Sequence, residues 1–343
     1  MMNYDEMKFV IEAQSGGKNT VILDDAGKPS IMVRLPRQTY ASLGLGSSTA
    51  THPAWIVNGV EKGEIFVGKY QACVIGGKAY SLPMQDPKVS INYDQAIEYC
   101  ESKGRGWHLM TNAEYAAIAL WCKANGHLPG GNNNFAQDIY KPWERAVVIA
   151  ADADCRTATG SGPRSWSHDG SNEGIFDING NVWEWCGGFR QIEGELNIIP
   201  NNDAAGGADQ SAASQDWKAL LQDGSLVAPG TANTLKWDWV NDRVTLSTAL
   251  TNLKDESHRN DFKQTTAAKG VAVPEILKAL ALHPDGTDYR NDCHYMYSVD
   301  ERLPFRGGDM HYVAGAGVFA LILARVRSYD TSHLGFRPAY VEL

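Results

Sequence analysis

The 343-residue sequence has no apolar run approaching the roughly 20 residues that a membrane-spanning helix needs. Residues 1–10 carry acidic side chains and no apolar stretch typical of an export signal. Clusters of lysine and arginine are also missing, and 40 acidic residues outnumber 31 basic ones, for a net charge of −9. Nucleic acids attract proteins through basic patches. We therefore expect no nucleic-acid binding, no membrane insertion, and synthesis as a soluble cytoplasmic chain.

Metal-binding and catalytic signatures are missing as well. The nine histidines form no HExxH pattern, and no GxxxxGK[ST], GxGxxG or GxSxG run occurs. The six cysteines never form a CxxC pair: Cys73, Cys100, Cys122, Cys155, Cys186 and Cys293. Such spacing favours free buried thiols over a zinc knuckle or a redox motif. We expect no metal and no cofactor.

Glycine, proline and tryptophan are plentiful, at 34, 14 and 10 residues. This composition predicts many tight turns around large aromatic side chains, so the expected class is α+β or irregular mixed. With 43% hydrophobic residues, the chain can form one large domain with insertions or two ordinary ones.

Local patterns divide the chain into an N-terminal module and a main domain. Two strand-like runs, residues 20–23 and 31–35, flank an Asp-Ala-Gly-Lys-Pro turn, and residues 42–51 are typical of a linker. Residues 1–50 thus predict a small N-terminal β module and linker, and residues 51–343 the main domain.

Helical signals within the main domain are clearest in two places. Apolar residues at helical spacing predict a helix over residues 91–103. Thr111 and Glu114 form a capping-box pattern that starts a second helix, which Asn125-Gly126 ends. Residues 191–303 have little periodicity and predict an insertion that walls the binding surface, with short helices at 215–222 and 274–283.

Two segments resemble the formylglycine-generating-enzyme (sulfatase-modifying factor) family. They are residues 91–122, INYDQAIEYCESKGRGWHLMTNAEYAAIALWC, and residues 174–185, GIFDINGNVWEW, which is similar to the family's GxxDxxGNVWEW signature. The resemblance implies an α+β, C-type-lectin-like fold of the formylglycine-generating-enzyme subtype. Trp183 and Trp185 share one face of the expected strand, where we expect them to pack in the core.

The C-terminal segment 306–337 resembles the variable region of proteins targeted by diversity-generating retroelements, which share this fold. Its fixed frame includes FRGG at residues 305–308, Arg327-Ser328 and LGFRP at residues 334–338. The framed positions hold residue types reachable by changing the adenines of an AAC or AAT codon; Met310 does not. With Asp309, they form the predicted ligand-binding surface: His311, Tyr312, Gly315, Ile322, Ala324, Arg325, Tyr329, Asp330, Thr331, Ser332 and His333.

Strand alternation separates this surface from the core. Phe319, Leu321 and Leu323 should point inward, whereas Ile322 and Ala324 should point outward and be exposed. The two tyrosines of the surface would supply rigid contacts, its charged and histidine side chains polar ones, and Gly315 and Ala324 hollows.

The resemblance implies a receptor-binding role with no catalytic site. The partner would be a host-cell surface protein or another macromolecular receptor, bound by a phage or prophage tail protein on the virion, or by a protein on the bacterial cell surface. The N-terminal module would then attach the domain to the virion or to sister subunits.

Two alternatives are an enzyme and a lectin. Matching Arg327-Ser328 to the enzyme family places Phe319 and Ala324 where its active cysteines stand, so a relative of that enzyme would be inactive. Residues 239–242, Trp-Val-Asn-Asp, are similar to the Trp-Asn-Asp run of calcium-dependent sugar-binding lectins. The extra valine breaks its spacing, and no Glu-Pro-Asn or Gln-Pro-Asp triplet accompanies it.

Overall fold

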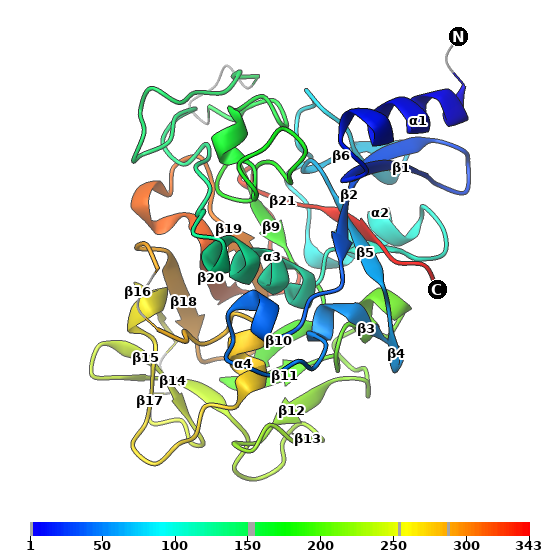
Figure 1. Cartoon of the computed structure of the whole chain (residues 1–343). Coiled ribbons are helices and arrows are strands. Elements are labelled where there is room, and N and C mark those ends of the chain that lie inside the picture. The colour runs from blue at the N-terminus through cyan, green and yellow to red at the C-terminus, as the bar shows by residue number, and fades with distance from the viewer. Residues whose placement is uncertain (1–2, 150–154, 253–254, 287–288) are drawn as a thin grey trace.

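A computed structural model describes residues 3–149, 155–252, 255–286 and 289–343 of the chain. Two β-sheets share the molecule with the central helix α3 (Asn112–Ala124), which crosses in front of the larger sheet (Figure 1). Within these ranges, no helix is both long and apolar enough to cross a membrane.

The smaller sheet joins the two ends of the chain. Its strands lie in the order β1 (Asn19–Leu23), β2 (Pro29–Pro36), β5 (Glu64–Gly68), β22 (Pro338–Tyr340) and β8 (Trp107–Leu109). The predicted strands at 20–23 and 31–35 are confirmed. They do not form a separate module, because β2 pairs along its length with β5 beyond the predicted boundary at residue 50.

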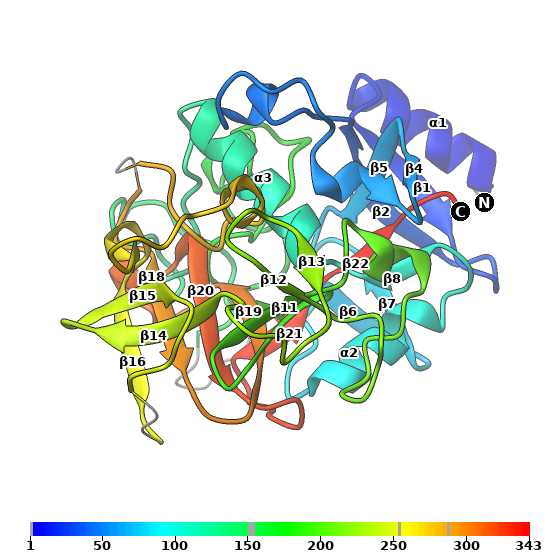
Figure 2. The same ribbon diagram turned by 90° about the horizontal axis from the view of Figure 1, so that it is seen from below.

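The expected linker at residues 42–51 is packed instead of free. It includes most of the 3-10 helix Ala41–Leu43, and Leu43 and Leu45 are buried in the main core that α3 shares. Helix α1 (Tyr4–Gln14) was not predicted; it begins with a capping box between Asn3 and Glu6 and lies at the edge of the molecule (Figures 1 and 2). No residue of α1 is fully buried, so it lacks a strong apolar stripe.

The two predicted helices of the main domain are confirmed. Helix α2 (Tyr93–Glu101) falls within residues 91–103, and α3 starts at the predicted cap. The Thr111 side chain accepts a hydrogen bond from the Glu114 amide, and the Glu114 carboxylate accepts one from the Thr111 amide. Nearly every residue of α3 is buried, so this helix forms the centre of the core.

The larger sheet has thirteen strands, nine of them in the order β16, β18, β20, β19, β10, β11, β14, β15, β17. Their bounds are β16 (Ser257–Asp261), β18 (Cys293–Tyr297), β20 (Gly317–Arg325), β19 (Glu301–Gly307), β10 (Phe189–Ile192), β11 (Glu195–Ile198), β14 (Lys236–Val240), β15 (Arg243–Ser247) and β17 (Thr266–Ala267). Off this path lie β9 (Trp183–Trp185), β12 (Lys218–Leu220), β13 (Leu226–Val227) and β21 (Leu334–Phe336).

Residues 191–303 therefore build most of the larger sheet. The helix expected at 215–222 is wrong: β12 lies there, paired with β11, and Trp217 is fully buried beside it. The helix expected at 274–283 is present but shorter, as α4 (Glu275–Ala279). Two small hairpins complete the strands: β3 (Ile56–Val57) with β4 (Val60–Glu61), and β6 (Ala72–Ile75) with β7 (Lys78–Ser81).

Candidate ligand-binding surface

One face of the larger sheet carries a row of side chains from several strands. Arg259 of β16 pairs with Tyr295 of β18, Tyr295 with Ile322 of β20, and Ile322 with Phe305 of β19. Phe305 pairs in turn with Trp185 of β9. Directly paired residues on neighbouring strands point to the same face. Segments from three distant parts of the sequence thus share one surface.

A pocket with a volume of about 330 Å³ lies on this surface.

 
The pocket is open to solvent and lies where the loops before and after β20 rise above the sheet. It is lined by eight of the twelve predicted residues: Asp309, Tyr312, Ile322, Ala324, Arg325, Tyr329, Thr331 and His333. The structure therefore brings most of the predicted surface together around one cavity.

Strand β20 separates the pocket from the core. Phe319, Leu321 and Leu323 are fully buried in the main hydrophobic cluster, as the alternation predicted. Ile322 and Ala324 point to the opposite face, but they are only 5% and 9% exposed. The expectation that they are exposed is wrong, because aromatic side chains of β9, β18 and β19 pack around them and leave them as the pocket floor.

The other predicted residues have different surroundings. The His311 ring lies 4.7 Å from the Phe135 ring and 4.9 Å from that of His333, between centroids. Gly315 is buried, and a Cβ atom added there would lie 2.9 Å from Nη2 of Arg259. Asp330 is exposed and Ser332 half-buried, and neither lines the pocket.

The Asp309 side chain is buried, with only 5% of its surface exposed. Its carboxylate accepts hydrogen bonds from Nε1 of Trp183 at 3.1 Å and from the His311 amide at 2.8 Å. Nδ1 of His333 lies 3.6 Å away. Burial raises the pKa of this carboxyl group, and the bonds and the histidines oppose that shift. Asp309 thus holds one wall of the pocket in place.

Five pocket residues were not predicted: Trp183, Ser257, Tyr295, Tyr297 and Phe305. Ser257, Tyr295 and Tyr297 belong to residues 191–303, so this segment contributes to the pocket lining. That it is an insertion beside a binding surface stays a prediction. The alternation in Cys-His-Tyr-Met-Tyr at residues 293–297 was the available signal, because it places both tyrosines on one face of a strand. Trp183 and Trp185 pack in the core as predicted, and Trp183 also reaches the pocket.

Arginines lie over several tyrosine rings of the pocket. The Arg259 guanidinium is 5.5 Å from the Tyr295 ring and 5.6 Å from that of Tyr312. Arg325 lies 4.7 Å above Tyr329. A guanidinium stacked on an aromatic face keeps its N–H edge available for hydrogen bonds to a ligand. Arg259 and Arg325 are both exposed, so they give the rim positive charge in an acidic protein.

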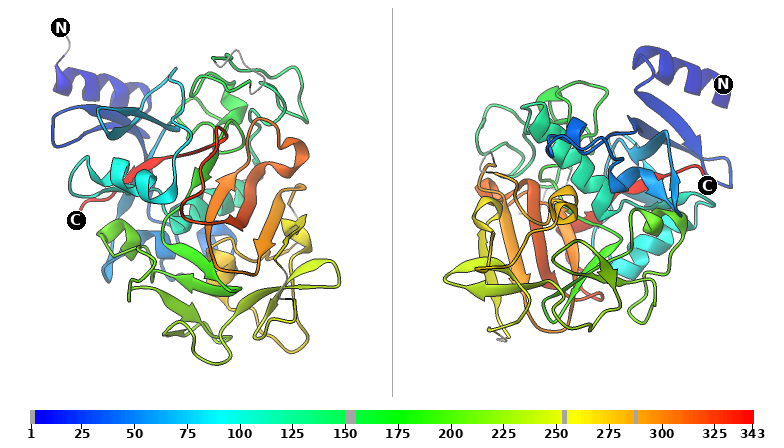
Figure 3. Two further views of the ribbon diagram at one scale, coloured as in Figure 1. Left: turned by 180° about the vertical axis from the view of Figure 1, so that it is seen from behind. Right: turned by 60° about the horizontal axis from the view of Figure 1, so that its bottom comes forward.

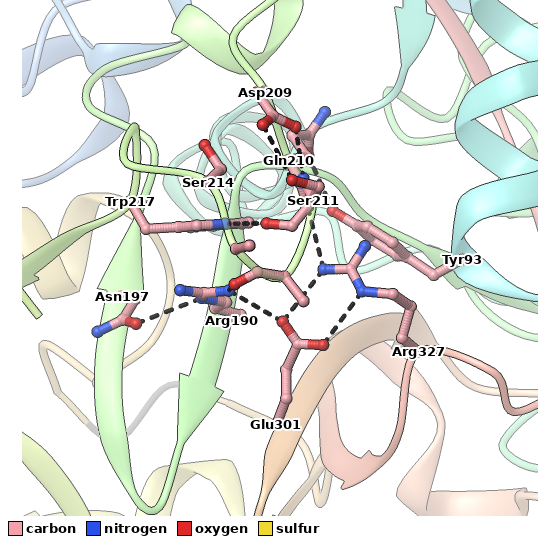
Figure 4. Close-up of polar contacts among 12 residues, drawn as sticks. Tyr93, Arg190, Asn197, Asp209, Gln210, Ser211, Ser214, Trp217, Glu301 and Arg327 are labelled. Carbon is pink, nitrogen blue, oxygen red and sulfur yellow. Dashed lines mark hydrogen bonds and ion pairs between the residues drawn. The ribbon is translucent and has the colours of Figure 1, made fainter.

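A charged network anchors the C-terminal side of the pocket (Figure 4). Arg327 donates to Glu301 through Nε and Nη2, each at 3.1 Å, and to Asp94 at 2.7 Å. Arg190, stacked on Trp217, donates to the same Glu301 at 3.1 Å. Arg327 also holds the backbone carbonyl of Gln210. Arg327 therefore connects the loop after β20 to α2 and to residues 191–303.

A buried ion pair anchors the segment that follows the pocket. Arg337 and Glu184 are both buried, with Nη2 of the arginine 2.6 Å from Oε1 of the glutamate. Two further Arg337 bonds reach the carbonyls of Gly68 and Phe176. Beside the pair, β21 runs parallel to β9. Residues 174–185, which resemble the enzyme family, and the C-terminal segment thus form one connected frame.

The positions relevant to catalysis hold no thiol. The Phe319 ring packs against Phe262 at 5.6 Å and Tyr289 at 4.7 Å, and Ala324 is part of the pocket floor. Cys293 is buried, which raises the pKa of its thiol to about 12. All six cysteines are free, as expected, although Cys155 is only half-buried.

The lectin-like run has a local structural explanation. Asn241 and Asp242 have φ values of 52° and 58° and form the tight turn between β14 and β15, which suits these residue types. Trp239 stacks on His258 with 4.6 Å between ring centroids. Among the described residues, no group of three or more histidine, cysteine or acidic side chains is arranged to hold a metal ion.

Comparison with known proteins finds one family that is similar to part of the chain. Residues 62–225, just under half of the chain, match the sulfatase-modifying factor enzyme 1-like domain. No curated protein matched the chain.

Three solved structures align over 94% of this chain with low similarity. Variable protein 1 of Treponema denticola has 12% identity, a TM-score of 0.33 and 98% of its own chain covered. The major tropism determinant P3c variant has 11% identity, a TM-score of 0.33 and 71% of its own chain covered. PvdO of Pseudomonas aeruginosa has 15% identity, a TM-score of 0.29 and 97% of its own chain covered. The mixed architecture confirms the predicted α+β class, and residues 62–225 of the chain are similar to the sulfatase-modifying factor enzyme 1-like domain. The C-type-lectin-like subtype stays a prediction.

Proposed function

We propose that this protein binds a macromolecular ligand through the pocket above β20 and the loops around it, and that it catalyses no reaction. The observation that carries the proposal is the pocket itself: eight residues of one C-terminal segment line it, while the frame residues 305–308 and 334–338 are buried. Aromatic side chains with polar neighbours around a cavity are typical of recognition surfaces.

The two kinds of position in this segment have separate roles. Frame residues such as Arg327 and Arg337 form ion pairs and backbone contacts that fix the loops. Arg325 lies at the end of β20 and Tyr329 and Thr331 lie on the loop after it, and none of the three is fully buried. Residues at the second kind of position can change without loss of the fold, which suits a diversified surface.

We further propose that this protein is a phage or prophage tail protein, carried on the virion after cytoplasmic synthesis, and that it binds a host-cell surface protein. A bacterial surface-displayed binder is the alternative setting. The coding DNA tests the diversification directly. We expect a nearby reverse-transcriptase gene and a near-copy of the segment for residues 306–337 that differs at adenines. Their absence would favour an inactive enzyme relative.

A display experiment tests binding without knowledge of the natural ligand. The full chain is displayed on yeast with His311, Tyr312, Arg325, Tyr329 and His333 diversified, and clones are selected on lysozyme as a model protein. We expect folded clones that bind lysozyme and lose binding when the five positions are returned to their original residues. If no folded clone binds, the pocket is not a recognition surface.

The enzyme alternative has its own test. Formylglycine formation in the related family requires thiols, and Phe319 and Ala324 supply none at the matching positions. We expect the purified protein to leave a sulfatase-type cysteine peptide unconverted, with or without copper. An aldehyde product detected by mass spectrometry would overturn the proposal.

A further inference from the structure

A short loop beside the pocket exposes an unusual number of large apolar side chains. Residues 135–149, here called the apolar loop, include six of the fourteen large hydrophobic residues that are notably exposed in the described chain. They are Phe135, Tyr140, Trp143, Val147, Val148 and Ile149, with Trp143 at 76% exposure. Exposed apolar residues scattered singly are ordinary, but a cluster of this kind marks an interaction surface.

The apolar loop is held rigidly, although its side chains are exposed. Buried Asn132 and Asn133 accept hydrogen bonds from the amides of Ala136 and Ile139, at 2.7 and 2.8 Å. Buried Asp138 accepts bonds from the Tyr140 and Lys141 amides, both at 2.9 Å.

The two sides of the loop are joined as well. The Ala146 amide donates to the Ala136 carbonyl at 3.2 Å, beside a bridge between Gln137 and Arg145. A rigid surface loses little conformational entropy when it binds a partner.

The loop is continuous with the pocket. The Phe135 amide donates to the Met310 carbonyl at 2.8 Å, and the Val313 amide donates to the Asn133 carbonyl at 2.7 Å. The Phe135 ring packs against His311, whose ring contacts the pocket residue His333. The segment from β19 to β20 and the loop of residues 130–149 also lie side by side in Figures 1 and 3.

We propose that the apolar loop is a fixed second half of the ligand-binding surface, and that it contacts an apolar patch on a protein ligand. This inference rests on the proposed function. A pocket of 330 Å³ is at the lower end of the volumes that hold one small molecule, whereas a stable protein interface covers about 800 Å² on each partner. The area beyond the pocket must come from its surroundings, and the adjoining loop is their exposed apolar part. A free sugar or small metabolite would need no such surface.

The lysozyme-binding clones described above allow a direct test. In several independent clones, Trp143→Ala is expected to weaken binding by at least about tenfold, although position 143 was never diversified. Phe9→Ala is the matched control, because Phe9 is 71% exposed on α1, away from the pocket. This control should leave binding unchanged. Both variants should keep the melting temperature of their parent, since neither side chain packs in the core.

Each other outcome has a defined meaning. If clones bind lysozyme but Trp143→Ala has the same small effect as Phe9→Ala, the inference fails and the proposed function stands. If no clone binds, both fail. A second copy of this chain is the other possible partner of the loop, and light scattering measures the oligomeric state. A dimer that Trp143→Ala converts to a monomer would assign the loop to self-association and overturn the inference.

Discussion

The two faces of β20 have opposite surroundings, although they belong to one nine-residue strand. Phe319, Leu321 and Leu323 are fully enclosed by the main core. Ile322 and Ala324 are nearly as inaccessible, yet an open pocket lies directly above them. Low exposure alone therefore does not distinguish core from binding surface. The presence of a cavity distinguishes them. A side chain beside a cavity can become smaller or larger with less loss of packing than a side chain in a closed core.

The largest expected effect comes from the core face. Phe319→Ala should lower the free energy of unfolding by roughly 3–5 kcal/mol, and Leu321→Ala by roughly 2–5 kcal/mol, because each leaves a cavity in a closed core. Urea denaturation measures both losses. A loss below about 1 kcal/mol for either variant would contradict the assignment of this face to the core.

A buried aspartate near the core face should give a pH-dependent effect. Asp292 accepts a hydrogen bond from the Phe319 amide at 2.8 Å, and burial raises its pKa to about 7. In the unfolded chain this group ionises near pH 4. The folded state therefore binds an additional proton between about pH 4 and pH 7, so this group's contribution to stability falls as the pH rises through that window.

Asp292→Asn removes this titration. The stability of the variant relative to the original protein should rise from pH 4 to pH 7 and level off above it. Chemical denaturation at several pH values measures the difference. The pH profile of Asp309→Asn can be compared with that of Asp292→Asn, because Asp309 is a buried aspartate on the pocket side and His333 lies near its carboxylate. Parallel pH profiles for Asp292→Asn and the original protein would show that Asp292 is ionised in the fold.

The pocket floor should show an intermediate effect. Ile322→Ala removes buried apolar surface, but it enlarges an existing pocket instead of creating a closed cavity. We expect a loss of about 1–2 kcal/mol in the free energy of unfolding. A loss equal to that of Leu321→Ala in the same urea series would mean that both faces of β20 are ordinary core.

The rim should tolerate change best. Tyr329 is half-buried beneath Arg325, so Tyr329→Ser should alter stability by less than about 1 kcal/mol. In lysozyme-binding clones that retain Tyr329, the same substitution should reduce binding markedly. Unchanged binding across all such clones would separate this rim from the recognition surface.

The smallest expected effect is that of a chelator. EDTA should leave the melting temperature and the binding of selected clones unchanged, because among the described residues neither face of β20 has three or more side chains arranged to hold a metal ion. A clear fall in melting temperature on EDTA addition, reversed by calcium, would reveal a structural cation.

Much of the fold and part of the site were predictable from local patterns. Thr111 and Glu114 located the start of α3, and the alternation from Phe319 to Leu323 separated the two faces of β20. These features depend on neighbours a few residues apart. The β12 strand was missed because its pairing with β11 and the burial of Trp217 are tertiary features that outweigh a weak helical pattern.

The sequence by itself determined the family resemblance, the caps of the main helices, and which residues of the C-terminal segment share a face. Those properties follow from residue types at short, regular spacing. Only the tertiary structure decided that Ile322 forms the floor of a pocket and that Tyr295 and Tyr297, from residues 191–303, line it. It also decided that the 135–149 loop lies next to this pocket. The physical reason is that burial and cavities depend on contacts between segments far apart in the chain, which local periodicity does not encode.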